Sequence, residues 1–129
     1  MRGEYPCDNH LFYAKGDACM QIKTQRDGEM LTVLLMGELD HHSAAPLRVE
    51  LDGLLADPSI RRLVLDLSGV TFMDSSGLGV VLGRYKLIKE RGGSMGVTGA
   101  NNPVGRILKM AGVYTLLGQQ DAERGKGHV

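Results

Sequence analysis

The amino-acid sequence predicts a single α/β domain built on a mixed, mostly parallel β-sheet of four to five strands, with an N-terminal hairpin and helices packed against the sheet. The chain has 129 residues, of which 43% are apolar, and this is enough for one hydrophobic core. Strand-like and helix-like segments alternate along most of its length, and no repeat or linker divides it. We expect an N-terminal arm over residues 1–17, the core domain over 18–118 and a polar tail over 119–129.

The first regular element is predicted to be a β-hairpin. Apolar and polar residues alternate from Met20 to Gln25, and Asp27 and Gly28 then turn the chain into the apolar run Leu31 to Met36. The preceding residues 1–17 show neither a helical nor a strand period, so we expect a loosely ordered arm there.

Three helices are predicted after the hairpin. The first follows Ser43, a preferred N-cap residue, and ends before Pro58. The second has the clearest apolar stripe in the sequence and stops at Gly92. The third begins at Asn102 and ends at Gly112.

The remaining strands are predicted between and after these helices. Leu63 to Leu67 is a nearly continuous apolar run, which is typical of a central parallel strand covered by helices on both faces. Residues 68–74 are expected to form a loop. Ser94 to Thr98 reads as another strand, and Val113 to Leu117 as a last one.

Composition excludes several classes of function. Fifteen basic residues balance fifteen acidic ones, so no global field favours nucleic acid as a direct partner. The apolar stretches are too short to span a membrane, and the N-terminus lacks the apolar core of a secretory signal, so we expect a cytoplasmic protein. Cys7 and Cys19 are expected to be free thiols. No metal-ligand spacing and no Walker loop occurs, so we expect neither a metal nor another cofactor.

Two segments are expected to meet at one edge of the sheet, because the carboxyl ends of parallel strands open onto the same edge and α/β folds place their sites there. One segment, 37–43, leaves the second strand of the hairpin. The other, 72–79, leads from the central strand into the long helix.

The second segment carries a candidate modification site. Ser75 and Ser76 begin the long helix, where unpaired backbone N–H groups and the helix dipole favour an anion such as a phosphate. Asp74 carries a negative charge, the same sign as a phosphate on either serine. Gly77 and Gly79 are expected to leave room for another protein to approach. The alternative is that the two serines merely cap the helix.

The sequence from Phe72 to Tyr85, FMDSSGLGVVLGRY, resembles the signature of the STAS-domain family of anti-sigma factor antagonists. The sequence from Gly37 to His42, GELDHH, resembles the second motif of that family, and both motifs occur in the expected order. The resemblance covers residues 19–118 and is closest to antagonists of the sporulation type.

The resemblance implies a non-enzymatic binding protein without catalytic residues that acts by partner switching. The unphosphorylated antagonist would bind an anti-sigma factor that is also a serine kinase, with ATP or ADP bound to the kinase, and so free the sigma factor. Phosphorylation of the serine after the motif's Asp, here Ser75, would switch the antagonist off. A PP2C-type phosphatase would restore it.

Residues around Ser75 and on the 37–43 segment are expected to contact the partner. These residues are Asp40, His41, His42, Asp74, Ser76, Gly77, Leu78 and Gly79. Residues 40–42 have an alternative interpretation as polar side chains exposed on a loop.

Other interpretations keep the fold or change the class. A STAS domain of a general stress-response pathway, or a detached relative of transporter-linked STAS domains, would keep the fold and act in another circuit, but the long motif favours the sporulation type. A serine hydrolase would use Ser75 as the nucleophile, but Met73 stands where the G-x-S-x-G motif needs a glycine.

A metal-dependent phosphoesterase with an Asp-His-His motif is a further alternative. Such a site needs more ligands from other strand ends, and only His10 and His128 remain.

Overall fold

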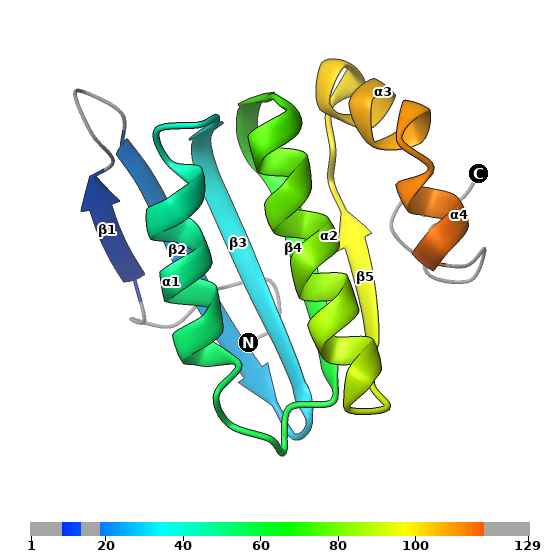
Figure 1. Ribbon diagram of the computed structural model, residues 1–129. Helices are drawn as coiled ribbons and strands as arrows, with labels where there is room; N and C mark the ends of the chain where they lie inside the picture. Colours follow the sequence, from blue (N-terminus) through cyan, green and yellow to red (C-terminus); the bar gives the residue numbers. More distant parts are fainter. Residues whose placement is uncertain (1–8, 14–18, 118–129) are drawn as a thin grey trace.

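The computed structural model describes residues 9–13 and 19–117. Five strands form one sheet in the order β1-β2-β3-β4-β5 (Figure 1). The strands are β1 (Asn9–Tyr13), β2 (Cys19–Asp27), β3 (Met30–Leu39), β4 (Arg62–Met73) and β5 (Ser94–Thr98). The helices are α1 (Ala44–Leu54), α2 (Ser75–Glu90), α3 (Asn102–Met110) and α4 (Val113–Leu117).

The strand pairings confirm the predicted α/β class. β2 and β3 form the expected antiparallel hairpin, and Gly28 adopts the positive φ of 63° that its turn requires. β3, β4 and β5 are parallel, and α1 and α2 provide the crossovers between them. Arg26 and Asp57 tie the hairpin turn to the loop after α1 through a 2.8 Å ion pair.

Two strands differ from the expectation. β1 lies in the segment that showed no strand period, because backbone pairing with β2 supplies the hydrogen bonds that side-chain alternation does not signal. The predicted loop over 68–74 is largely strand, since β4 continues to Met73 and follows β3 through two register shifts. The rest of the arm (1–8 and 14–17) and the tail (119–129) lie outside the described residues.

The predicted last strand is a helix. Val113 to Leu117 forms α4, after Gly112 turns the chain with a φ of 78°. The Tyr85 hydroxyl of α2 donates a hydrogen bond to the Leu116 carbonyl at 3.0 Å. A run of five apolar or β-branched residues fits either structure by pattern, so contacts with the rest of the domain decided between them.

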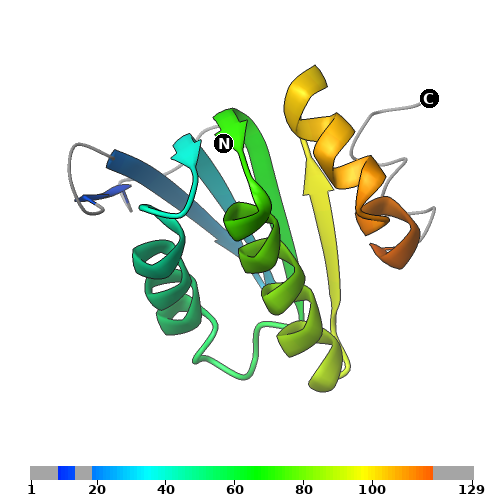
Figure 2. The same cartoon turned by 45° about the horizontal axis from the view of Figure 1, so that its top comes forward.

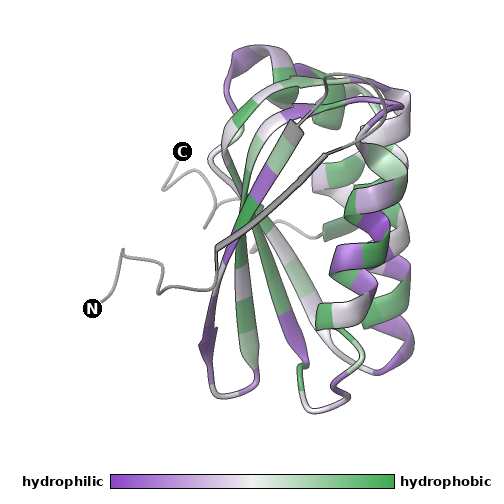
Figure 3. Cartoon of the chain, turned by 90° about the vertical axis from the view of Figure 1, so that its left-hand side faces the viewer, coloured by the Kyte–Doolittle hydropathy of each residue, from purple (hydrophilic) through white to green (hydrophobic). Residues whose placement is uncertain are grey.

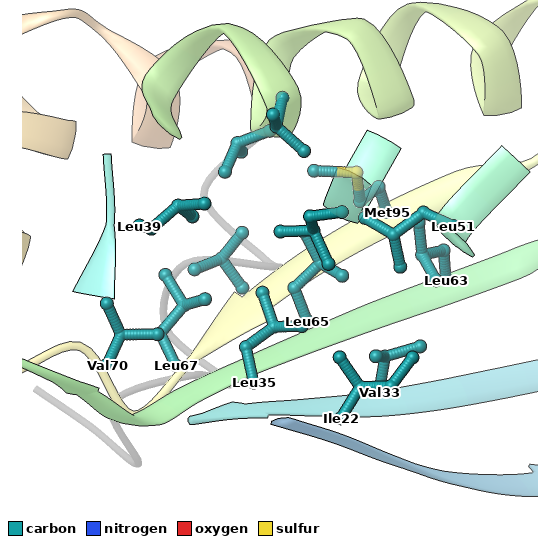
Figure 4. Close-up of a cluster of buried hydrophobic side chains, with 14 of the residues drawn as sticks. Ile22, Val33, Leu35, Leu39, Leu51, Leu63, Leu65, Leu67, Val70 and Met95 are labelled. Carbon is teal, nitrogen blue, oxygen red and sulfur yellow. The ribbon is translucent and has the colours of Figure 1, made fainter. Parts of the chain in front are cut away.

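Helices α1 and α2 cover one face of the sheet, and the core lies between the two layers (Figure 3). Alternate strand residues point into this layer, as Figure 4 shows for Ile22, Val33, Leu35, Leu63, Leu65, Leu67 and Met95. The expectation that β4 is covered on both faces is wrong, because Val64 and Asp66, on its opposite face, are only half-buried. α3 contacts β4, α4 contacts β5, and both helices lie at the β5 side of the sheet (Figures 1 and 2).

Candidate functional site

The two predicted segments meet at the carboxyl edge of the parallel strands. α1 begins just after β3 and α2 just after β4, so both helices start at this edge (Figures 1 and 2). Leu39 pairs with Met73 in the ladder, and the Asp74 N–H donates to the Leu39 carbonyl at 3.2 Å. The structure therefore joins the end of β3 directly to the start of α2.

Asp74 is the N-cap of α2. Its backbone is extended, with φ −118°, and its Oδ1 accepts hydrogen bonds from the N–H groups of Ser76 at 2.9 Å and Gly77 at 3.1 Å. The alternative in which Ser75 and Ser76 cap the helix is therefore wrong. The Asp74 carboxylate already occupies two of the N–H groups that were expected to be free for an anion.

The side chains of the first turn of α2 differ in exposure. Ser75 is exposed, and Asp74, Ser76 and Leu78 are half-buried. Gly79 is exposed, and a Cβ added there would have no other heavy atom within 4 Å. Ser75 and Gly79 are therefore the two exposed positions of this turn.

Gly77 has a different role from the one expected. It is buried, and a Cβ added there would lie 2.6 Å from both the Leu39 Cγ and the Leu39 carbonyl oxygen. The residue lets the first turn of α2 pack directly on the end of β3. Because it is buried, Gly77 does not provide open space at the surface beside Ser75.

The turn between β3 and α1 is organised by Asp40 and Ser43. Asp40 Oδ1 accepts hydrogen bonds from the N–H groups of His42 at 2.9 Å and Ser43 at 3.1 Å. The Ser43 side chain is fully buried, and its hydroxyl donates to the Glu38 carbonyl at 2.7 Å. Ser43 therefore occupies the N-cap position of α1, but its side chain makes no cap hydrogen bond, contrary to the expectation. Its hydroxyl links the turn to β3 instead.

The titratable residues of this turn are Asp40, which is half-buried, and the two exposed histidines that follow it. Burial alone would raise the pKa of Asp40, but the hydrogen bonds from Ser43 and His42 outweigh burial and hold that pKa below its ordinary value. His41 and His42 are exposed, and their ring centroids lie 4.0 Å apart. Asp40 is therefore a fixed carboxylate with two imidazoles beside it.

Phe72 belongs to this edge of the sheet, although the sequence did not single it out. It pairs with Glu38 across β3 and β4, and its side chain is 48% exposed. Val70 and Met73, which lie on either side of Phe72 in β4, are buried. The interruption of the apolar run of β4 just before Phe72 was therefore a signal of this exposure that could have been read from the sequence. A large exposed aromatic residue two positions before Asp74 is typical of a protein-contact surface.

The edge carries negative charge. The two segments 37–43 and 72–79 contain Glu38, Asp40 and Asp74 but no lysine or arginine.

Across the described ranges 9–13 and 19–117, no three His, Cys, Asp or Glu side chains are grouped as a metal site would require. No helix in this part of the chain is both long and apolar enough to cross a bilayer.

Comparison with known proteins identifies the family. The model of the STAS domain matches residues 21–122. An anti-sigma F factor antagonist from Paenibacillus polymyxa is 43% identical over 104 residues, which cover 81% of this chain and 89% of the relative. An anti-sigma-B factor antagonist from Bacillus subtilis (strain 168) is 29% identical over 98 residues, which cover 76% of this chain and 88% of the relative.

A solved structure extends the comparison to the fold. The Bacillus cell fate determinant SpoIIAA in its phosphorylated form aligns with a TM-score of 0.61 at 23% identity, over 73% of this chain and 86% of that chain. Similarity at this level of identity concerns the fold alone. The STAS-domain model, which matches residues 21–122, and the relative that is 43% identical show that the chain belongs to the STAS-domain family of anti-sigma factor antagonists.

Proposed function

We propose that the unphosphorylated protein binds an anti-sigma factor that is also a serine kinase, with ATP or ADP bound to the kinase, and thereby frees a sigma factor. Phosphorylation of Ser75 by that kinase switches the antagonist off, and a PP2C-type phosphatase switches it on again. The protein itself acts by binding and catalyses no reaction.

The observation that carries this proposal is that Ser75 is exposed and directly follows Asp74, the N-cap of α2. A phosphoserine has a charge of about −1.5 to −2 at neutral pH. Because Asp74 already accepts from the Ser76 and Gly77 N–H groups, the phosphate would stand next to a carboxylate with no basic residue in either site segment. The modified edge would repel a partner whose docking surface is acidic or apolar.

The partner surface is proposed to include both segments. It comprises Asp40, His41, His42, Asp74, Ser76, Leu78 and Gly79, with Gly77 beneath them. We add Phe72 because of its exposure at the same edge.

The sporulation circuit is favoured over the general stress response. The relative named for sigma F is 43% identical, whereas the relative named for sigma B is 29% identical over a similar length. The proposed partner is therefore an anti-sigma factor of the sporulation type.

The test is phosphorylation by the cognate anti-sigma kinase with Mg-ATP. We expect one phosphate per chain, located at Ser75 by peptide mapping, and its removal by the PP2C-type phosphatase. Ser76→Ala is the matched control and should still be modified. Label on Ser76, or on Ser75→Ala, would contradict the assignment.

A further inference from the structure

Arg84 of α2 is a buried cation with incomplete hydrogen bonding. It is 7% exposed, and its Nε and Nη1 are buried without a hydrogen-bond partner within the described part of the chain. Its Nε lies 3.3 Å from Asp52 Oδ1 of α1, which makes an ion pair but not a hydrogen bond. Burial lowers the pKa of Arg84 from its ordinary value; the Asp52 carboxylate opposes this shift, and Arg48 adds to it.

Stability does not explain why arginine stands at this position. Buried donors without acceptors are destabilising, and the Asp52 side chain is 47% exposed, so water screens the ion pair and the pair offsets little of this cost. Arg91 shows the contrasting case, because it donates to the carbonyls of Leu55, Asp57 and Ile60 and so joins the end of α2 to the loop after α1.

The location of the pair suggests another role. Arg84 is the tenth residue of α2 and Asp52 the ninth residue of α1, so the two lie at similar depth, about 12 to 14 Å below the first residues of their helices. Both helices start at the candidate site (Figure 1). A change in helix spacing at this pair would move the turn before Ala44 relative to Ser75.

We propose that Arg84 is a positioning residue, which holds α1 at a fixed spacing from α2 through Asp52 and thereby sets the position of the Asp40–Ser43 turn relative to Ser75. This inference rests on the proposed function for its binding consequence. The two halves of the partner surface lie at the starts of different helices, one in the turn that leads into α1 and the other around the first turn of α2. The Arg84–Asp52 pair is an ionic contact between these helices. Arginine is kept at position 84 because the spacing of α1 and α2 is needed for binding, although its unpaired donors lower the free energy of unfolding.

The test compares Arg84→Met with Arg91→Met. Arg84→Met should unfold at the same or a higher urea concentration than the wild type, because an apolar side chain of similar length replaces unpaired donors and the half-exposed Asp52 carboxylate stays hydrated. Its backbone amide NMR signals over 40–43 should shift, and its affinity for the ADP-loaded anti-sigma kinase should fall about 3- to 30-fold. Arg84→Lys, which keeps a charge near Asp52, should recover part of that affinity.

Arg91→Met should show the opposite pattern. It should unfold at a lower urea concentration because three carbonyls lose their donor, yet bind the kinase like the wild type when folded. The inference is overturned if Arg84→Met fails to fold, if its 40–43 amides do not shift, or if it binds the kinase like the wild type. If the wild type itself does not bind the kinase, the proposed function fails, and the amide shifts alone decide the role of Arg84.

Discussion

At the residue scale, the Asp74 carboxylate determines what a phosphate on Ser75 would meet. A helix N-terminus attracts anions through its free N–H groups, but Asp74 already binds those of Ser76 and Gly77. A phosphate on Ser75 would be stabilised by the helix dipole, but the Asp74 carboxylate would repel it. Modification of Ser75 should therefore change the charge of the surface more than the fold beneath it.

Substitution of Ser75 separates recognition from modification. Ser75→Ala adds no charge, so the variant should bind the kinase and remain active without being phosphorylated. Ser75→Asp should keep its stability, since the helix dipole contributes about 0.3 to 1 kcal/mol for an acidic residue in the first turn. It places a second carboxylate beside Asp74, however, and should weaken binding about a hundredfold, because like-charge contacts cost several kcal/mol.

Thermal unfolding and kinase affinity of both variants check this prediction. The electrostatic explanation is wrong if Ser75→Asp binds as tightly as Ser75→Ala. It is also wrong if Ser75→Asp loses binding only because it unfolds.

The same chemical change at two glycines of α2 should have opposite effects. Gly77→Ala places a methyl group 2.6 Å from the Leu39 carbonyl oxygen and should lower the free energy of unfolding by about 1 to 3 kcal/mol. Gly79→Ala meets no heavy atom within 4 Å and should raise it by about 0.5 to 1 kcal/mol through helix propensity. Urea unfolding measures both, and effects of the same sign would contradict the packing described at Gly77.

At the scale of elements, α4 depends on α2 for its position. The Tyr85 hydroxyl donates to the Leu116 carbonyl near the end of a helix of five residues, which is too short to be stable alone. Tyr85→Phe should therefore weaken α4 by about 1 kcal/mol and leave the sheet intact.

Native-state hydrogen exchange measures this effect. Amides of α4 should exchange several-fold faster in Tyr85→Phe, while those of β3 and β4 keep their protection. Tyr114→Phe is the control, because the Tyr114 hydroxyl has no hydrogen bond among the described residues. Faster exchange throughout the sheet would show that α4 is not a separate cooperative unit.

At the scale of the whole molecule, carboxylates at both ends of the domain link stability to pH. The hydrogen bond from the Arg26 guanidinium, with those from Ser59, holds the pKa of Asp57 far below its ordinary value. The pKa of Asp40 is also below its ordinary value: burial would raise it, but the hydrogen bonds that Asp40 accepts outweigh burial. A carboxyl whose pKa is lower when folded contributes stability above its unfolded pKa, and this contribution is lost as the pH falls through the folded pKa.

We therefore expect the urea midpoint to fall as the pH drops below about 4, the ordinary pKa of aspartate. Asp57→Asn should be less stable than the wild type at neutral pH, and its midpoint should fall less between about pH 7 and pH 3. Urea titrations across this range measure both effects. An acid dependence equal to that of the wild type would show that Asp57 is not a source of the linkage.

The sequence by itself determined the features that rest on local rules. Period-two alternation with Asp27-Gly28 predicted the β2–β3 hairpin, and the apolar stripe ending at Gly92 predicted α2. The motif around Ser75 predicted the family, because its residue types and spacing are specific. The meeting of segments 37–43 and 72–79 also followed, since parallel strands end at one edge.

Tertiary structure decided what depends on distant partners. β1 is held by pairing with β2, and Val113 to Leu117 became a helix through contacts that its ambiguous pattern does not encode. Gly77 proved to be a packing position, because the end of β3 lies against the first turn of α2. In each case a short sequence was compatible with two local outcomes, and long-range contacts selected one of them.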